Sequence, residues 1–198
     1  MTTIMQQDGK ILVETPFEPS LPAKFRQMGG SWNDPYWTFK EDTDVFEGIK
    51  ELLLEKLGYD HDSPKGIVKI TTKNKVIADK KSVIVGGFIL AYARGRSSGA
   101  KVGAGVTLIR GEIGSGGSMK NWDSRVHADT TFKINGFPLS QIECYMENYT
   151  IEVIGGEDKT QAAFRIIEEQ MGVLKDAGVN ITKLQIALEN TDRGGERV

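Results

Sequence analysis

The sequence has very few of the residues that build covalent or metal-bound frameworks. Its 198 residues include one cysteine, Cys144, and two histidines, His61 and His127. A single cysteine excludes an internal disulfide and favours a reducing compartment. Two isolated histidines without a paired cysteine supply no zinc or iron ligand set. The sequence therefore predicts a cytoplasmic protein with no metal site and no cofactor.

Long apolar runs and catalytic signatures are also missing. Residues 1–10 are polar and lack the apolar core of a signal peptide. The longest apolar run, residues 82–93, contains two glycines and is shorter than the roughly 20 residues that a membrane span requires. The order of residues supports no serine–histidine–aspartate or cysteine–histidine pairing. We therefore expect a protein that is not an enzyme and does not associate with membranes.

Charge is distributed unevenly along the chain. Residues 1–63 carry 6 basic and 12 acidic side chains, and residues 136–198 carry 6 and 11. Residues 64–135 carry 13 basic and 4 acidic side chains, although the net charge of the whole chain is only −2. A basic block between two acidic ones is typical of a protein that binds a polyanion. A solvated basic surface without a partner is the alternative.

The first domain, residues 1–60, is predicted to be a small α+β module with the order β-α-β-β-α. Residues 11–15 indicate a strand and residues 20–28 a short helix. Two aromatic stretches around an Asn-Asp-Pro turn predict a hairpin. A longer helix is expected from Asp44, which has capping-box spacing to Glu47.

A tryptophan motif, Gly29-Gly30-x-Trp32-x-x-x-x-Trp37-x-Phe39, lies between the two predicted helices. Residues 11–58 resemble the small HARP-type module found beside annealing helicases and in bacterial and phage proteins. The resemblance implies DNA binding at junctions and single-strand boundaries. It departs from the family at Ser31, where a basic residue is usual. Trp32 and Trp37 are either contact residues or the core of a tiny domain.

The remainder of the chain predicts a second α+β domain. Residues 61–66 contain proline and glycine, lie where the charge changes sign, and indicate a linker. Residues 67–189 predict a basic antiparallel sheet with two or three helices, and residues 190–198 a disordered tail. Strands are expected over residues 67–72, 82–93 (a central strand), 102–109, 125–134, 151–154 and 181–188, and helices after Ser140 and over 158–177.

A glycine-rich segment, residues 110–122, holds four glycines, two serines and Lys120. Backbone N–H groups of such a segment can cradle a phosphate, but neither a Walker A loop nor a Rossmann fingerprint is present. The segment is either a flexible connection between strands or a loop that closes over a nucleic-acid backbone. Three carboxylates nearby lack the clustering of a magnesium-dependent nuclease: Glu112, Asp123 and Asp129.

The leading hypothesis is a non-enzymatic protein that binds single-stranded or junction nucleic acid, with DNA preferred, through a basic glycine-rich β surface. Cations at strand ends would neutralise phosphates, and aromatic rings would stack on bases. The expected contact residues are Trp37, Arg94, Arg96, Lys101, Arg110, Lys120, Trp122 and Arg125. Tyr92 is a further ring available for stacking. A second set of cations consists of Lys65, Lys69, Lys73, Lys75, Lys80 and Lys81.

The alternative hypothesis is a protein-interaction inhibitor or adaptor of phage or plasmid type that docks on a nucleic-acid-processing complex. Its acidic first module would then enter a basic channel of the partner. The residues that would imitate nucleic acid are Asp42, Asp44, Glu47, Glu51 and Glu55. An enzyme with an unrecognised site is the third interpretation.

Overall fold

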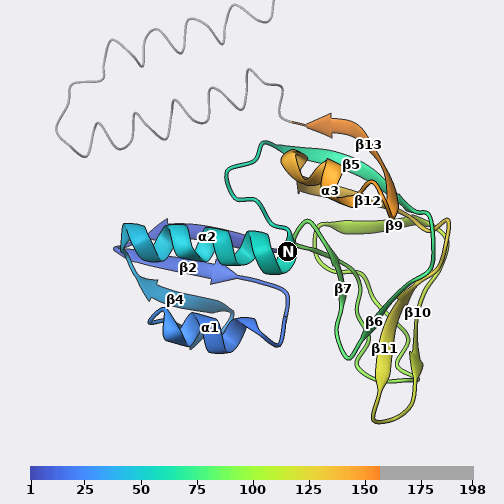
Figure 1. Cartoon of the computed structure of the whole chain (residues 1–198), viewed down its shortest axis with the longest axis horizontal. Helices are drawn as coiled ribbons and strands as arrows, with labels where there is room; N and C mark the ends of the chain where they lie inside the picture. The colour runs from blue at the N-terminus through green and yellow to red at the C-terminus, as the bar shows by residue number, and fades with distance from the viewer. Residues whose placement is uncertain (157–198) are drawn as a thin grey trace, which may run out of the picture. The chain divides into compact units, whose positions relative to one another are not determined.

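The structure, a computed structural model, describes residues 1–156 (Figure 1). The helix predicted over 158–177, the strand over 181–188 and the tail over 190–198 lie outside the described residues. Residues 1–156 combine helices with antiparallel strands, which confirms the predicted α+β class. The strands form four sheets with the orders β1-β2-β4-β3, β13-β5-β12-β9, β10-β11-β6 and β7-β8.

The first sheet packs one face against two helices. Its strands are β1 (Thr3–Gln7), β2 (Lys10–Glu14), β3 (Ser31–Asn33) and β4 (Tyr36–Lys40), and its helices are α1 (Leu21–Gln27) and α2 (Thr43–Leu57). Strand β1 precedes the order predicted from the sequence. It pairs with β2 across a turn in which Asp8 and Gly9 both have positive φ, 51° and 68°. An Asp-Gly pair is a hairpin signal. It was overlooked because the residues around it are polar and predict no strand.

Helix α2 begins earlier than the predicted capping box. The Asp42 carboxylate accepts a hydrogen bond from the backbone N–H of Val45 at 3.0 Å, so Asp42 is the N-cap. The prediction of a helix start at Asp44 is wrong, because Asp44 already lies in the first turn, where its charge favours the helix dipole. The helix ends at Gly58 in the left-handed region, as predicted.

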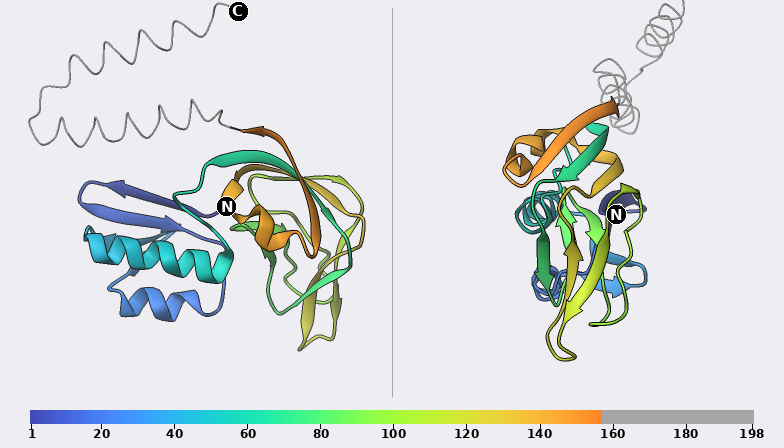
Figure 2. Two further views of the ribbon diagram at one scale, coloured as in Figure 1. Left: turned by 45° about the horizontal axis from the view of Figure 1, so that its top comes forward. Right: turned by 90° about the vertical axis from the view of Figure 1, so that its right-hand side faces the viewer.

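The other three sheets come from residues 65–156. Their strands are β5 (Lys65–Thr72), β6 (Val76–Asp79), β7 (Val83–Val85), β8 (Phe88–Ala91), β9 (Val106–Arg110), β10 (Ile113–Gly117), β11 (Trp122–Val126), β12 (Thr131–Pro138) and β13 (Tyr149–Gly156). A 3-10 turn, η1 (Leu139–Gln141), and one short helix, α3 (Ile142–Tyr145), precede β13. Figure 2 shows β10 and β11 as a long hairpin beside β6. No helix within residues 1–156 is long and apolar enough to cross a membrane.

The apolar run 82–93 is a tight hairpin, and the prediction of one central strand is wrong. Strands β7 and β8 turn at Gly86 and Gly87, whose φ angles are 58° and 82°. The run is apolar on both faces because the hairpin lies inside the core: Val85, Phe88 and Leu90 are at most 1% exposed. Two consecutive glycines supply the positive φ angles that a two-residue hairpin turn requires.

Three other predicted segments are also divided differently. Residues 125–134 form the end of β11 and the start of β12, separated at a turn where Asp129 has a φ of 58°. Apolar residues alternate across this turn as they would in a strand, so the sequence predicted a single strand over 125–134. The glycine-rich segment 110–122 contains β10, so neither a flexible connection nor a closing loop describes residues 113–117. The helix after Ser140 is a single turn.

Buried apolar side chains gather in two clusters. One contains residues of the first sheet with α1 and α2, and the other contains residues of β5 to β13. The Thr2 hydroxyl donates to the Gly87 carbonyl at 2.9 Å, and the Gly87 N–H donates to the Leu57 carbonyl at 2.8 Å. The predicted linker 61–66 is also fixed by a hydrogen bond. The hydroxyl of Ser63 accepts from the Ser140 N–H at 2.9 Å.

Candidate functional site

Of the two tryptophans in the hairpin of the first module, only one is accessible. Trp37 is 6% exposed, and its ring centroid lies 5.3 Å from that of Phe25 in the core. Its ring therefore has no open face for stacking, and Trp37 does not join the other predicted contact residues. Trp32 lies opposite Trp37 across the hairpin, with 5.6 Å between the ring centroids, and is 53% exposed.

Arg125 is held by a carboxylate beside it. Its Nε and Nη2 donate to the two oxygens of Asp123 at 2.5 Å and 2.9 Å. These hydrogen bonds lower the pKa of Asp123, whose side chain is only 8% exposed. The guanidinium lies over Gly116, where a Cβ would collide with it. Arg125 is therefore a paired cation on the strand face and is not free to hold a phosphate.

Arg110 belongs to a different sheet from Arg125, the other expected contact cation that lies in a strand. It ends β9 and pairs with Thr131 of β12 in the four-stranded sheet. The same sheet places Lys133 opposite Lys69, and Lys69 forms an ion pair with Glu152 of β13 at 3.2 Å. These three cations form a second group, which we name the outer-sheet cations: Lys69, Arg110 and Lys133.

Three predicted contact residues lie on one closed loop between β8 and β9. Tyr92 and Lys101 form an antiparallel bridge with two backbone hydrogen bonds of 2.9 Å and 3.0 Å. Inside the bridge, the Ser98 hydroxyl accepts from the Arg94 N–H at 3.0 Å and donates to backbone carbonyls. The loop carries Arg94 and Arg96 as exposed side chains on a fixed backbone.

Two serines fasten this loop to the β10-β11-β6 sheet. The Ser124 hydroxyl of β11 accepts from the Ala93 N–H at 3.0 Å, and the Ser115 hydroxyl of β10 donates to the Arg96 carbonyl at 2.9 Å. Ser115 and Ser124 are directly opposite each other in register, and Trp122 lies two residues from Ser124 on the same strand face. The loop and the Trp122 ring therefore occupy the same side of the sheet.

The loop contains a small open pocket of about 200 Å³. Its lining residues are Tyr92, Arg94, Ser98, Gly99 and Lys101. Gly99 has a φ of 67°, and no atom lies within 4 Å of the position that a Cβ would take. The backbone therefore turns there without crowding the opening. Two cations, a hydroxyl and an aromatic ring thus meet around a space that is large enough for a phosphate group. Ser98 and Gly99 were not predicted, although their Ser-Gly sequence is a turn signal.

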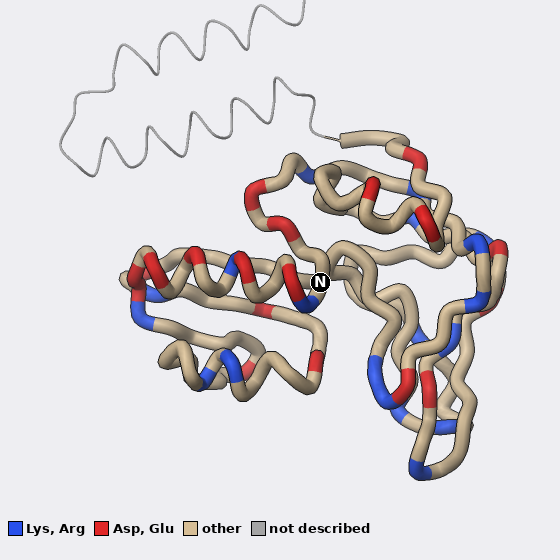
Figure 3. The backbone as a smooth tube through the Cα atoms, viewed as in Figure 1, with Lys and Arg blue, Asp and Glu red and all other residues tan. Residues whose placement is uncertain are grey.

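Further cations lie at turns of the β10-β11-β6 sheet. Lys120 lies in the turn between β10 and β11, and the Lys80 N–H at the end of β6 donates to the Trp122 carbonyl at 2.9 Å. Figure 3 shows basic residues at the turns beside β6, β10 and β11, with acidic residues on β6 and β11 among them, whereas acidic residues outnumber basic ones along α2. We use the word lobe for the β10-β11-β6 sheet together with the loop between Tyr92 and Lys101. Its cations are named the lobe cations: Lys80, Lys81, Arg94, Arg96, Lys101 and Lys120.

The lobe cations form no close ion pair within residues 1–156. In the part of the chain that the structure describes, none of them has a carboxylate oxygen within 4.0 Å. The ion pairs of this part use other cations, mainly Lys24, Lys50 and Lys56 of the helices. A polyanion therefore meets unpaired charge at the lobe and paired charge at the helices.

The described residues offer no metal centre. No group of three or more histidine, cysteine or acidic side chains is arranged to hold an ion within residues 1–156. Asp123, one of three carboxylates considered from the sequence, is already paired with Arg125. Comparison with known proteins gives no further guidance, because no family model, no curated protein and no solved structure matches this chain.

Proposed function

We propose that this chain is a non-enzymatic, cytoplasmic nucleic-acid-binding protein that holds single-stranded or junction nucleic acid at the lobe cations. The observation that carries the proposal is the loop closed by Tyr92 and Lys101, which gathers two unpaired cations and a ring around one pocket. Phosphates would be neutralised by the lobe cations, and Tyr92 and Trp122 would stack on bases.

The choice of single-stranded or junction nucleic acid over a duplex is supported by the elements that carry the charge. The lobe cations lie on loops and turns, and helix α2 is acidic where a major-groove helix would be basic. Single strands and junctions expose unstacked bases to the two rings, whereas a duplex hides them. The exposed Trp32 is the tryptophan of the first module available for contact.

A salt series tests this function. A labelled single strand of about 12 nucleotides lies within the roughly 4–16 that one single-strand-binding domain covers. Contacts with four phosphates predict that the logarithm of the binding constant falls with the logarithm of salt concentration with a slope of about −3. Fluorescence anisotropy across the series measures that slope. Absence of binding at low salt would overturn the proposal.

A second candidate is an adaptor that docks on a nucleic-acid-processing protein through its acidic module. The observation that favours it is an open groove of about 590 Å³ between α1 and α2. Its lining residues are Lys24, Gln27, Met28, Gly48, Glu51, Leu52 and Glu55. Met28 and Leu52 give the groove apolar surface, and Glu51 adds charge outside any ion pair of the described residues. Such a groove suits a basic segment with an apolar anchor.

The two candidates separate in one experiment. If the adaptor interpretation holds, the protein fails to bind the oligonucleotide at low salt. It then co-purifies with a nucleic-acid enzyme, and Glu51→Lys abolishes that association while Arg94→Ala leaves it intact. The first candidate predicts the reverse dependence on these two residues.

A further inference from the structure

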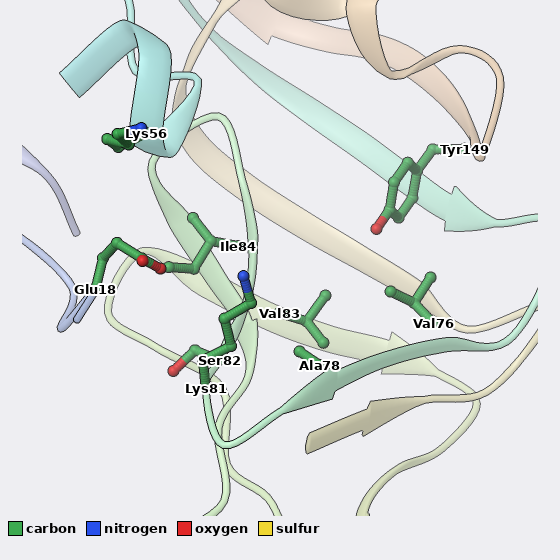
Figure 4. Close-up of a pocket in the computed structure, with 9 residues that line it drawn as sticks. All are labelled: Glu18, Lys56, Val76, Ala78, Lys81, Ser82, Val83, Ile84 and Tyr149. Carbon is green, nitrogen blue, oxygen red and sulfur yellow. The ribbon is translucent and has the colours of Figure 1, made fainter. Parts of the chain in front are cut away.

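A third pocket, apart from the loop pocket and the α1–α2 groove, lies where α2, the β6–β7 turn and β13 approach one another. It has a volume of about 230 Å³ (Figure 4). Its lining residues are Glu18, Lys56, Val76, Ala78, Lys81, Ser82, Val83, Ile84 and Tyr149. Sequence patterns did not reveal it, because its walls come from segments more than a hundred residues apart. The volume is below the roughly 300–1,000 Å³ of sites for drug-sized ligands, so the pocket suits a smaller ligand.

The walls and the rim of this pocket differ in character. Val76, Ala78 and Val83 supply an apolar wall, and Val83 is only 4% exposed. The Lys81 side chain extends from the β6–β7 turn toward this wall, and the Tyr149 hydroxyl points into the pocket from the opposite side (Figure 4). Apolar surface with a few convergent polar groups is the usual composition of a small-molecule site.

The polar groups have free hydrogen-bonding capacity. Among residues 1–156, no group forms a hydrogen bond with the Tyr149 hydroxyl, and no carboxylate lies within 4.0 Å of the Lys81 amine. Burial raises the pKa of Tyr149 to about 12, so the hydroxyl stays protonated and can donate. Lys56 is engaged by Glu55 at 2.6 Å, and Glu18 contributes a carboxylate that accepts.

The ligand must therefore combine an apolar planar body, an acceptor, a donor and an anion. A nucleobase with its phosphate has all four, because base edges carry both carbonyl or ring-nitrogen acceptors and amino or imino donors. Enzymes and binding proteins hold extruded bases between apolar side chains with hydrogen bonds to the edge. Glu18 would face the donor side of the base, and Lys81 would face the phosphate.

We infer that this pocket receives one nucleobase, with Tyr149 donating to the base edge and Lys81 binding the adjoining phosphate. The inference rests on the proposed function when the base belongs to a bound strand. The position of the pocket supports it: Ala78 of the pocket pairs in register with Ser124, which holds the Arg94 loop. Both pockets therefore border the same face of the β10-β11-β6 sheet.

Two oligonucleotides of equal charge test the inference. One is the strand of about 12 nucleotides used above, and the other carries abasic sites throughout. We expect the intact strand to bind about tenfold more tightly, since stacking contributes to each held base. Tyr149→Phe, which keeps the ring and breaks no hydrogen bond of the described residues, should remove several-fold of that difference. Lys81→Gln should also reduce the difference between the two strands, whereas Lys80→Gln, which removes a lobe cation outside the pocket, should weaken both strands alike.

A pocket-filling variant provides the second line of evidence. Ala78→Leu occupies the space without changing charge, and Ile77→Leu on the opposite face of β6 controls for strand perturbation. If Ala78→Leu and Tyr149→Phe bind both strands like the unaltered protein, the pocket is not a base site, although the salt-dependent function stands.

Free mononucleotides separate the two possible sources of the base. If neither strand binds, the proposed function fails, and nucleoside monophosphates then decide the inference. Perturbation of the Val83 and Tyr149 NMR signals by a monophosphate, lost in Lys81→Gln, identifies a free nucleotide as the ligand. Unchanged signals with all four monophosphates overturn the inference.

Discussion

The Tyr145 hydroxyl lies against the Cα of Gly58, in the space that a Cβ would fill. The same hydroxyl accepts a hydrogen bond from the Gly86 N–H at 3.1 Å. Gly58 ends helix α2 and Gly86 begins the turn between β7 and β8. One side chain from α3 therefore joins the end of a helix in the first module to the core hairpin of the following sheets.

Replacing Gly58 by alanine should destabilise the protein through two effects. The residue has a φ of 63°, which costs an L-residue roughly 1–2 kcal/mol, and the new Cβ would displace Tyr145. Gly29→Ala isolates the first effect, because Gly29 has a φ of 83° and no atom within 4 Å of a built Cβ. Urea denaturation of both variants measures the difference. Equal losses would show that Tyr145 moves away without cost.

The N-cap of α2 gives a prediction with an adjacent control. Asp42→Ala removes the acceptor for the Val45 N–H and should lower the free energy of unfolding by about 1 kcal/mol. Asp44→Ala removes a charge from the first turn without removing a cap, so it should cost only a few tenths of that. The reverse ranking in denaturant titrations would restore the capping box at Asp44.

The two groups of cations predict different effects on nucleic-acid binding. Changing both Arg94 and Lys101 to alanine removes the two cations of the loop pocket and should flatten the salt slope by about 1.4, at roughly 0.7 per phosphate. Arg110 and Lys133, changed together, remove the same charge from the outer-sheet cations. Their double variant should leave the slope unchanged. Equal effects of the two double variants would show that only total charge matters.

Alkaline pH should weaken the fold through Tyr149. Burial raises the pKa of Tyr149 to about 12 from an ordinary value of 10.0, so the folded state disfavours the phenolate. The stabilisation is complete below pH 10, where both states are protonated, and declines as the pH rises to about 12. The loss is on the order of 2 kcal/mol. Denaturation at several alkaline pH values, compared with Tyr149→Phe, measures this part, because the variant lacks the titrating group.

Periodicity located most elements but not the places where the chain reverses. The strand over β5 and the hairpin of β3 and β4 were predicted, because alternation and turn residues agreed there. The run containing Gly86 and Gly87 was misread, because apolar residues on both sides look the same in a strand and in a buried hairpin. The glycines of β10 were misread because Gly116 makes room for Arg125, a relationship between strands that local sequence does not record.

The candidate site was foreseen only in part, for a related reason. The sequence identifies cations, but their pairing depends on partners brought near by the fold. Arg125 is paired by its neighbour Asp123, and Arg110 lies on another sheet, whereas Arg94 and Lys101 meet because a backbone bridge joins their loop ends. Trp37 is buried in the core of the first module, which the sequence left open as one of two alternatives. The pocket around Tyr149 required elements from three distant parts of the chain.

The bridge between Tyr92 and Lys101 also makes the exposed positions of residues 93–100 tolerant of substitution. Ladder bonds fix both ends of the segment, and serines of the neighbouring strands hold it from outside. Side chains at its exposed positions, such as Arg94 and Arg96, can therefore be changed while the supporting sheet stays intact.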